Sequence, residues 1–149
     1  MKDSRRLRPV ARIAHQQERN AARQLGDCLR QVEQQQKKLD DLLEYREQYI
    51  AGFQAAGKQG VSVVQLRDYQ LFLRRLDTAV TQQRQLLRTS RQHCEQSQSE
   101  WHNRHGHSMM IDKVVENRQQ VENRKRDERE QREQDDRPKD SGNGVLSDT

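Results

Sequence analysis

The sequence predicts an all-α fold, a long antiparallel two-helix coiled coil (a helical hairpin) with a disordered C-terminal tail. Three observations predict this fold class. Only 30% of the 149 residues are hydrophobic and 34% are charged, which leaves too little apolar surface for a compact globule of this length. Apolar residues recur at a mean spacing of about 3.5 positions in two long runs, as in a left-handed coiled coil. A glycine-rich segment separates the two runs.

The first run predicts a helix over about 5–54. Alternate steps of four and three residues from Leu7 lead to Phe53, and eleven of the fourteen positions reached are apolar. Pro9 is compatible with this helix because proline is tolerated in a first helical turn. The expected seam positions are Leu7, Ala11, Ala14, Glu18, Ala21, Leu25, Cys28, Val32, Gln35, Leu39, Leu42, Arg46, Tyr49 and Phe53.

Three glycines within the nine residues Gly52–Gly60 predict a turn at about 55–61. A Ser-x-x-Gln capping box follows directly, formed by Ser62 and Gln65. In such a box the serine hydroxyl accepts a hydrogen bond from the glutamine amide, and the glutamine side chain accepts one from the serine amide. A second helix is therefore expected to start at Ser62.

The second run predicts that this helix extends over about 62–136. Steps of three and four residues from Leu66 lead to Val115, and ten of the fifteen positions reached are apolar. Beyond Val115 the same spacing meets charged residues, so this part is expected to project past its partner helix, held by charge pairs within the helix. The expected seam positions are Leu66, Tyr69, Leu73, Leu76, Val80, Gln83, Leu87, Ser90, Cys94, Ser97, Trp101, Arg104, Ser108, Ile111 and Val115.

A short turn between two long amphipathic helices makes them antiparallel neighbours, so 1–136 is expected to be one coiled-coil domain. If Phe53 faces Leu66, Gln35 falls opposite Gln83, and a buried polar pair of this kind can fix the register of a coiled coil. The remaining residues, 137–149, contain proline and glycine and are expected to form the disordered tail.

The sequence offers no plausible active site. It contains no glycine-rich phosphate loop, no nucleophile elbow and no isolated carboxylate pair in an apolar setting. His102 and His105 share a helix face but have no acidic or cysteine partner at ligand spacing, and with His107 they are expected on the surface. We therefore expect no enzymatic activity, no cofactor and no metal site.

The two cysteines, Cys28 and Cys94, make neither a disulfide framework nor a ligand set, and this usage fits a reduced cytoplasmic compartment. Both stand at seam positions. The expected pairing places Cys28 opposite Ser90 and Cys94 opposite Leu25, so each is expected to act as a small buried hydrophobe.

The charge is concentrated at the N-terminal end. Residues 1–30 carry eight basic and three acidic side chains, a net +5 that equals the net charge of the whole chain, whereas 116–137 carry seven basic and eight acidic ones. A basic end favours an acidic partner, which could be nucleic acid, anionic lipid or an acidic protein surface, although simple solvation of an exposed helix explains it as well. No uninterrupted apolar stretch exceeds three residues, so we expect no direct membrane insertion.

The apolar surface near the turn is wider than a two-helix seam requires. It includes both phenylalanines and all three tyrosines of the chain. Such a surface is either a broader core, which could take a third helix from another copy, or an exposed docking surface on which aromatic residues serve as anchors. The residues that lie just outside the seam are Tyr45, Phe72, Ala79 and Leu86.

Over about 1–136 the sequence resembles the flagellar export protein FliJ family. The resemblance rests on the order and spacing of several short motifs, together with the size and the glycine-rich turn. These motifs are Ala22-Arg23-Gln24-Leu25-Gly26, Tyr45-x-x-x-Tyr49, Asp68-Tyr69-Gln70-Leu71-Phe72 and Leu76-Asp77-Thr78-Ala79.

The resemblance implies a soluble component of the bacterial flagellar type III protein export apparatus. Members of the family are antiparallel coiled coils similar to the rotor stalk of rotary ATPases, and they bind inside the hexamer of the flagellar export ATPase. They also engage the cytoplasmic domain of the export gate and escort export chaperones. The implied location is cytoplasmic and peripheral to the inner membrane, at the flagellar basal body. The implied export-gate-binding residues are Leu42, Tyr45, Tyr49, Phe72, Leu76 and Ala79.

Two alternatives remain at this point. The stalk protein of a virulence type III secretion injectisome belongs to the same class, although Asp68-Tyr69-Gln70 favours the flagellar machine. A basic coiled coil could instead bind nucleic acid. Because the few aromatic residues are concentrated away from the basic N-terminus, we expect no nucleic-acid partner.

Overall fold

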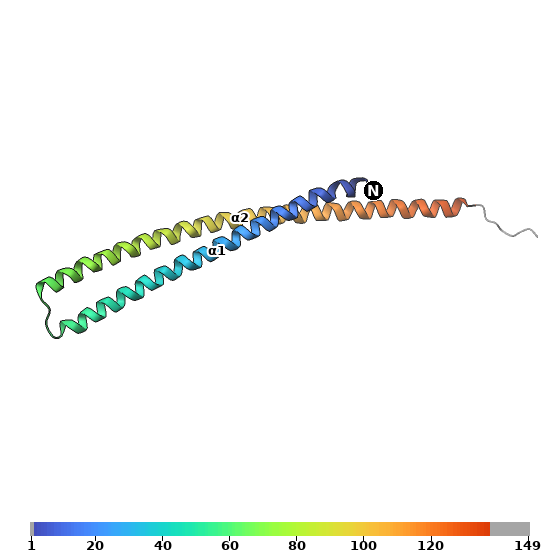
Figure 1. The fold of residues 1–149 in the computed structure, drawn as a ribbon. Coiled ribbons are helices and arrows are strands. Elements are labelled where there is room, and N and C mark those ends of the chain that lie inside the picture. Colours follow the sequence, from blue (N-terminus) through green and yellow to red (C-terminus); the bar gives the residue numbers. More distant parts are fainter. Residues whose placement is uncertain (1, 138–149) are drawn as a thin grey trace, which may run out of the picture. The chain divides into compact units, whose positions relative to one another are not determined.

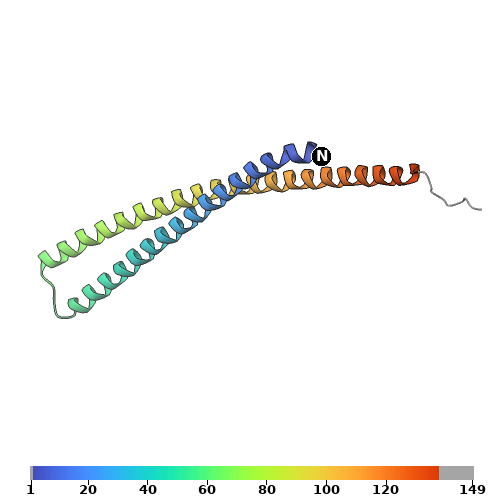
Figure 2. The same ribbon diagram turned by 45° about the vertical axis from the view of Figure 1, so that its right-hand side comes forward.

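The computed structural model describes residues 2–137 and contains two helices, α1 (Lys2–Gly57) and α2 (Val63–Asp136). The helices are antiparallel (Figures 1 and 2), and the described part of the chain contains no strand. The expected fold class, an all-α helical hairpin, is therefore confirmed. Apart from Arg137, the expected disordered tail lies outside the described residues.

The chain divides into two units, which are described separately. Residues 18–104 form the turn unit. Residues 2–17 and 105–137 form the end unit. Neither helix, over its described length, has a stretch apolar enough to cross a lipid bilayer.

The turn between the helices is closed by local hydrogen bonds. Gly60 has a φ of 90°, in the left-handed region that favours glycine. The predicted capping box is present: the Gln65 amide donates to Ser62 Oγ over 3.1 Å, and the Ser62 amide donates to Gln65 Oε1 over 2.9 Å. Ser62 is thus the N-cap of α2. α1 extends through Gly57, so residues 55–57 of the predicted turn are helical.

The predicted seam positions are the positions that the helices bury against each other. Of the two predicted sets, every member except Leu66 is buried or partly buried. The apolar centre of the turn unit is formed by Leu39, Val80 and Leu87, which are at most 7% exposed. Leu66 is 42% exposed, so the seam of α2 begins at Tyr69.

The separation of the helices within the turn unit follows side-chain size. Near the turn α1 and α2 stand apart, and they approach each other away from it (Figures 1 and 2). Aromatic residues occupy the seam near the turn, whereas the small residues Ala21, Cys28 and Cys94 are buried farther away. Interaxial distance depends on the side chains at the contact, so small residues let the backbones come close.

The predicted register is confirmed in one layer and wrong in two others. Gln83 Nε2 donates to Gln35 Oε1 over 2.6 Å and to the Gln35 carbonyl over 3.0 Å, as expected for opposed glutamines. Phe53, however, stacks on Tyr69 rather than facing Leu66, a shift of about one helical turn along α2. Two aromatic rings favour an offset stack, and the stacking of Phe53 on Tyr69 leaves Leu66 42% exposed.

A similar shift applies to the cysteines. The expected pairing placed Cys28 opposite Ser90, but Cys28 Sγ lies 3.4 Å from Ser97 Oγ, about two helical turns farther along α2. Both are buried, as predicted.

In the end unit α1 pairs with α2 farther along than expected. Asp3 Oδ2 lies 3.1 Å from Arg118 Nη1, and Ser4 Oγ donates to Glu122 Oε2 over 2.7 Å. The part of α2 from Val115 to Glu122 therefore has a partner, contrary to the prediction that it projects alone. Two differences combine here: α1 begins at Lys2, before its predicted start at about residue 5, and its first turn lies farther along α2 than the predicted register placed it. Pro9 therefore lies beyond the first helical turn.

Candidate docking surface and its relatives

Five aromatic rings form a continuous cluster between the helices near the turn. Tyr49 is at its centre: its ring centroid lies 4.6 Å from that of Phe72, 5.4 Å from that of Tyr69 and 6.4 Å from that of Tyr45. Tyr45 also meets Phe72 edge-on at 6.2 Å, and Phe53 stacks on Tyr69 at 3.8 Å with an interplanar angle of 11°. We call these five residues the aromatic cluster: Tyr45, Tyr49, Phe53, Tyr69 and Phe72.

The six residues implied as the gate-binding surface all lie in the turn unit, but they differ in accessibility. Tyr45 is 49% exposed, whereas Leu76 is 7% exposed and belongs to the buried core. Leu42 packs against the central core cluster. The partly buried members of the set are Leu42, Tyr49, Phe72 and Ala79.

Tyr45 is therefore the exposed member of the aromatic cluster, whereas its other four rings are partly buried. The contacts of Tyr45 with Tyr49 and Phe72 hold its ring in place. A ring that is fixed before binding loses little conformational entropy when a partner covers it.

An ion pair between the helices borders this surface. Arg46, a predicted seam position on α1, reaches α2 with its Nε 2.6 Å from Asp77 Oδ1. The Asp77 side chain is 52% exposed, so solvent screens the pair and it adds little stability. The pair places charged side chains beside the exposed apolar surface, and polar residues usually surround an anchor residue in this way.

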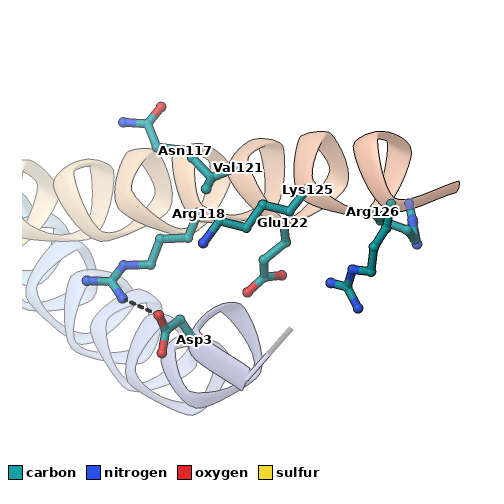
Figure 3. A pocket seen from close by; sticks show the side chains of 8 residues that line it. Asp3, Asn117, Arg118, Val121, Glu122, Lys125 and Arg126 are labelled. Atoms are coloured by element: carbon teal, nitrogen blue, oxygen red, sulfur yellow. Dashed lines mark ion pairs between the residues drawn. The ribbon is translucent and has the colours of Figure 1, made fainter. Parts of the chain in front are cut away.

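The end unit has a different character, because basic side chains line the groove between its helices. A groove of about 290 Å³ lies along the seam beyond Val115 (Figure 3). Figure 3 shows Arg118 reaching from α2 to Asp3 on α1. The basic residues that line the groove are Arg118, Lys125, Arg126 and Arg129.

Glu122 joins the two helices at this groove. Besides the bond from the Ser4 hydroxyl, it accepts the Ser4 backbone amide over 3.2 Å. The pKa of Glu122 is lowered to about 2, first by the bond from the Ser4 hydroxyl, then by the N-terminal amine and the Ser4 backbone amide. Ser4 was not among the predicted seam positions, although it stands three residues before Leu7, where the four-and-three spacing continues.

A Ser-His-Asp arrangement occurs in the end unit. His15 Nε2 lies 2.7 Å from Asp112 Oδ1, and His15 Nδ1 lies 3.4 Å from Ser108 Oγ. A nucleophilic serine must reach a substrate, but Ser108 is only 1% exposed. The three residues therefore form a polar packing layer between the helices.

The histidines singled out by the sequence, His102 and His107, are exposed, and His105 is partly buried. Among the described residues, histidine, cysteine and acidic side chains form no group of three that could hold a metal ion.

The comparisons identify the family. A family model described as the flagellar FliJ protein matches residues 2–137, nearly the whole chain. The chain belongs to the FliJ family. It is therefore a component of a flagellar type III export apparatus. Neither a curated protein nor a solved structure matches the chain.

Proposed function

We propose that this FliJ-family chain is the non-enzymatic stalk of the flagellar export machine. In this proposal it binds the export ATPase hexamer through its basic end unit and the cytoplasmic domain of the export gate through the aromatic cluster. It also escorts export chaperones, a role that only the family resemblance supports. With these partners it acts in the cytoplasm at the basal body, peripheral to the inner membrane. The flagellar family match favours this machine over a virulence injectisome.

The observation that carries the gate contact is the half-exposed Tyr45 on a preorganised aromatic cluster. Tyrosine and phenylalanine provide large contact areas, and residues of this kind dominate the binding energy of protein interfaces. A binding surface needs an exposed anchor residue and neighbouring side chains that hold this residue in place. The aromatic cluster has both, because Tyr45 is exposed and Tyr49 and Phe72 contact its ring.

The observation that supports the ATPase contact is the charge of the end unit. Residues 2–12 carry five basic side chains and one acidic one, and that acid, Asp3, is paired with Arg118. A cationic segment of this kind favours an acidic protein surface such as the inside of a ring.

The gate contact is tested with the double variant Tyr45→Ala/Phe72→Ala. Binding to the purified gate domain should weaken at least about tenfold, because two anchors are removed. Binding to the ATPase should be unchanged. Leu71→Ala is the matched control, since Leu71 is as exposed as Tyr45 but lies outside the implied surface. Isothermal titration calorimetry measures both affinities, and circular dichroism checks the helices.

The choice of residues matters for this test. Leu76→Ala is unsuitable because Leu76 is buried, and its truncation should cost about 2–3 kcal/mol of stability. If the double variant loses helicity in parallel with binding, the cluster is core and the proposed gate surface is wrong. If the wild type binds neither partner but is retained on nucleic acid in a salt-sensitive way, the chain is a nucleic-acid-binding coiled coil instead.

A further inference from the structure

Cys28 and Cys94 are both buried between the helices of the turn unit, at 5% and 7% exposure. Cys28 Sγ lies 3.4 Å from the hydroxyl of Ser97, which follows Cys94 by three residues and so shares its helix face. The Cys28 side chain therefore packs on the face of α2 that carries Cys94. Burial, together with the interaction with Cys28, raises the pKa of Cys94, which agrees with this placement.

The surroundings of the pair favour a short distance between the two backbones. A disulfide needs Cα atoms within about 7 Å of each other, closer than bulky seam residues allow. Here the seam positions that flank Cys94 on α2 are both serines, Ser90 and Ser97. Small side chains in adjacent layers bring the helices together.

Cys28 lines a surface groove. This groove, of about 360 Å³ beside the seam, is lined by Cys28, Ser97 and His93. A small reagent that enters it meets the Cys28 thiol. Burial raises the pKa of Cys94, which keeps that thiol protonated.

We propose that Cys28 and Cys94 are a reversible disulfide site, oxidised by a peroxide, that locks α1 to α2 within the turn unit. The Cys28 thiolate attacks a peroxide oxygen and becomes a sulfenic acid, and the departing hydroxide leaves as water with the proton that Cys28 lost. The Cys94 thiol then attacks the Cys28 sulfur, forming the disulfide and releasing a second water. Two thiols and one hydrogen peroxide thus give one disulfide and two waters, and two electrons pass from the sulfurs to the peroxide.

The disulfide closes a loop of the chain that contains the turn and the whole aromatic cluster, because both lie between residues 28 and 94. Joining these positions restricts the unfolded chain and prevents the helices from separating at the cysteine layer. The bond does not depend on the proposed partners, and it can be tested on the isolated chain.

The test is treatment of the full chain with hydrogen peroxide at low protein concentration, followed by blocking of free thiols and tryptic peptide mapping. The expected product is a cross-link between peptides Gln24–Arg30 and Gln92–Arg104, which contain the two cysteines and no methionine. Peptide mapping is preferable to intact mass, because Met109 and Met110 are exposed and also take up oxygen. Dithiothreitol should reverse the cross-link, and the thermal midpoint of the oxidised chain should rise by about 5 °C or more.

Two variants serve as controls. Cys94→Ser should give no cross-link, and Cys94→Ser/Ser99→Cys should give none within one chain, because Ser99 is exposed on a different face of α2. Three results would overturn the proposal: disulfides between chains only, over-oxidation of Cys28 without a cross-link, or a cross-link that leaves the thermal midpoint unchanged.

Discussion

Glu122 shows how a single charged residue can belong to a coiled-coil seam. The first amides of a helix have no partner within the helix, and the helix dipole makes that end positive. Glu122, on the other helix, accepts both the backbone amide and the hydroxyl of Ser4 in the first turn of α1. It therefore adds, from α2, a second anionic side chain to the first turn of α1, which already contains Asp3.

This arrangement predicts acid sensitivity of the end unit. The pKa of Glu122 is about 2 in the folded chain and about 4.3 in an unfolded one. A lowered pKa contributes stability that is present above the unfolded value and lost as the pH falls through the folded value. We expect amide hydrogen exchange in residues 2–17 to speed up between about pH 4.5 and pH 2 relative to Glu122→Gln measured at the same pH.

Glu122→Gln is the appropriate reference because it keeps a hydrogen-bond acceptor but does not titrate. Asp3 and Asp112, which pair with Arg118 and His15, are present in both proteins, so their titration cancels in the comparison. Equal acid responses in the two proteins would show that Glu122 does not couple folding of this end to pH.

At the scale of the helices, the N-cap of α2 fixes where the chain turns back. The two reciprocal bonds of Ser62 and Gln65 satisfy amides that the first turn of α2 would otherwise leave unpaired. The adjacent Gly60, with its positive φ, completes the reversal.

Removal of the Ser62 hydroxyl, which forms this cap, should lower the stability of the chain measurably. Ser62→Ala should lower the free energy of unfolding by about 1 kcal/mol, because the Gln65 amide loses its acceptor. Ser62→Asp should retain most of the stability, since a carboxylate also caps. Urea denaturation followed by circular dichroism measures both. A stable Ser62→Ala variant would mean that seam packing alone holds the start of α2.

The helices themselves could be predicted from the sequence, and their alignment only in part. The heptad spacing identified the buried positions because each helix buries the face on which its own apolar residues recur, and that face can be read from its sequence alone. The pairing across the turn assumed that Phe53 faces Leu66. The stacking of Phe53 on Tyr69 changes that pairing near the turn, and no local pattern reveals how two rings will stack. For the same reason the contact of Cys28 with Ser97 could not be foreseen.

The candidate docking surface, like the alignment of the helices, could be predicted only in part. Periodicity located the aromatic excess, and the family resemblance selected six residues from it. Periodicity could not say that Leu76 is buried while Tyr45 remains 49% exposed, because exposure depends on how far apart the helices stand.

For the whole molecule, the separation of aromatic and basic residues along the chain predicts two kinds of binding. Raising the salt concentration from about 50 mM to about 500 mM should weaken ATPase binding at least about tenfold, because screening reduces attraction to the cationic end. Gate binding should change by less than about threefold, since apolar burial drives it. Affinity measurements at both salt concentrations test this.

Charge reversal provides the control for the salt experiment. Arg5→Glu/Arg8→Glu changes two residues that line a groove of about 210 Å³ in the end unit. It should reduce ATPase binding at low salt and leave gate binding intact. Salt-independent ATPase binding, or loss of gate binding in this variant, would contradict the assignment of the two partners to the two units.

The placement of the aromatic residues also gives the chain two separate optical reporters. All three tyrosines belong to the aromatic cluster, whereas the single tryptophan, Trp101, lies beside His102 in another part of α2. Red-edge excitation of fluorescence, which selects tryptophan, therefore reports on the middle of α2, and tyrosine emission reports on the rings near the turn. A partner that covers the cluster would alter tyrosine emission and leave the tryptophan spectrum unchanged, without any attached dye.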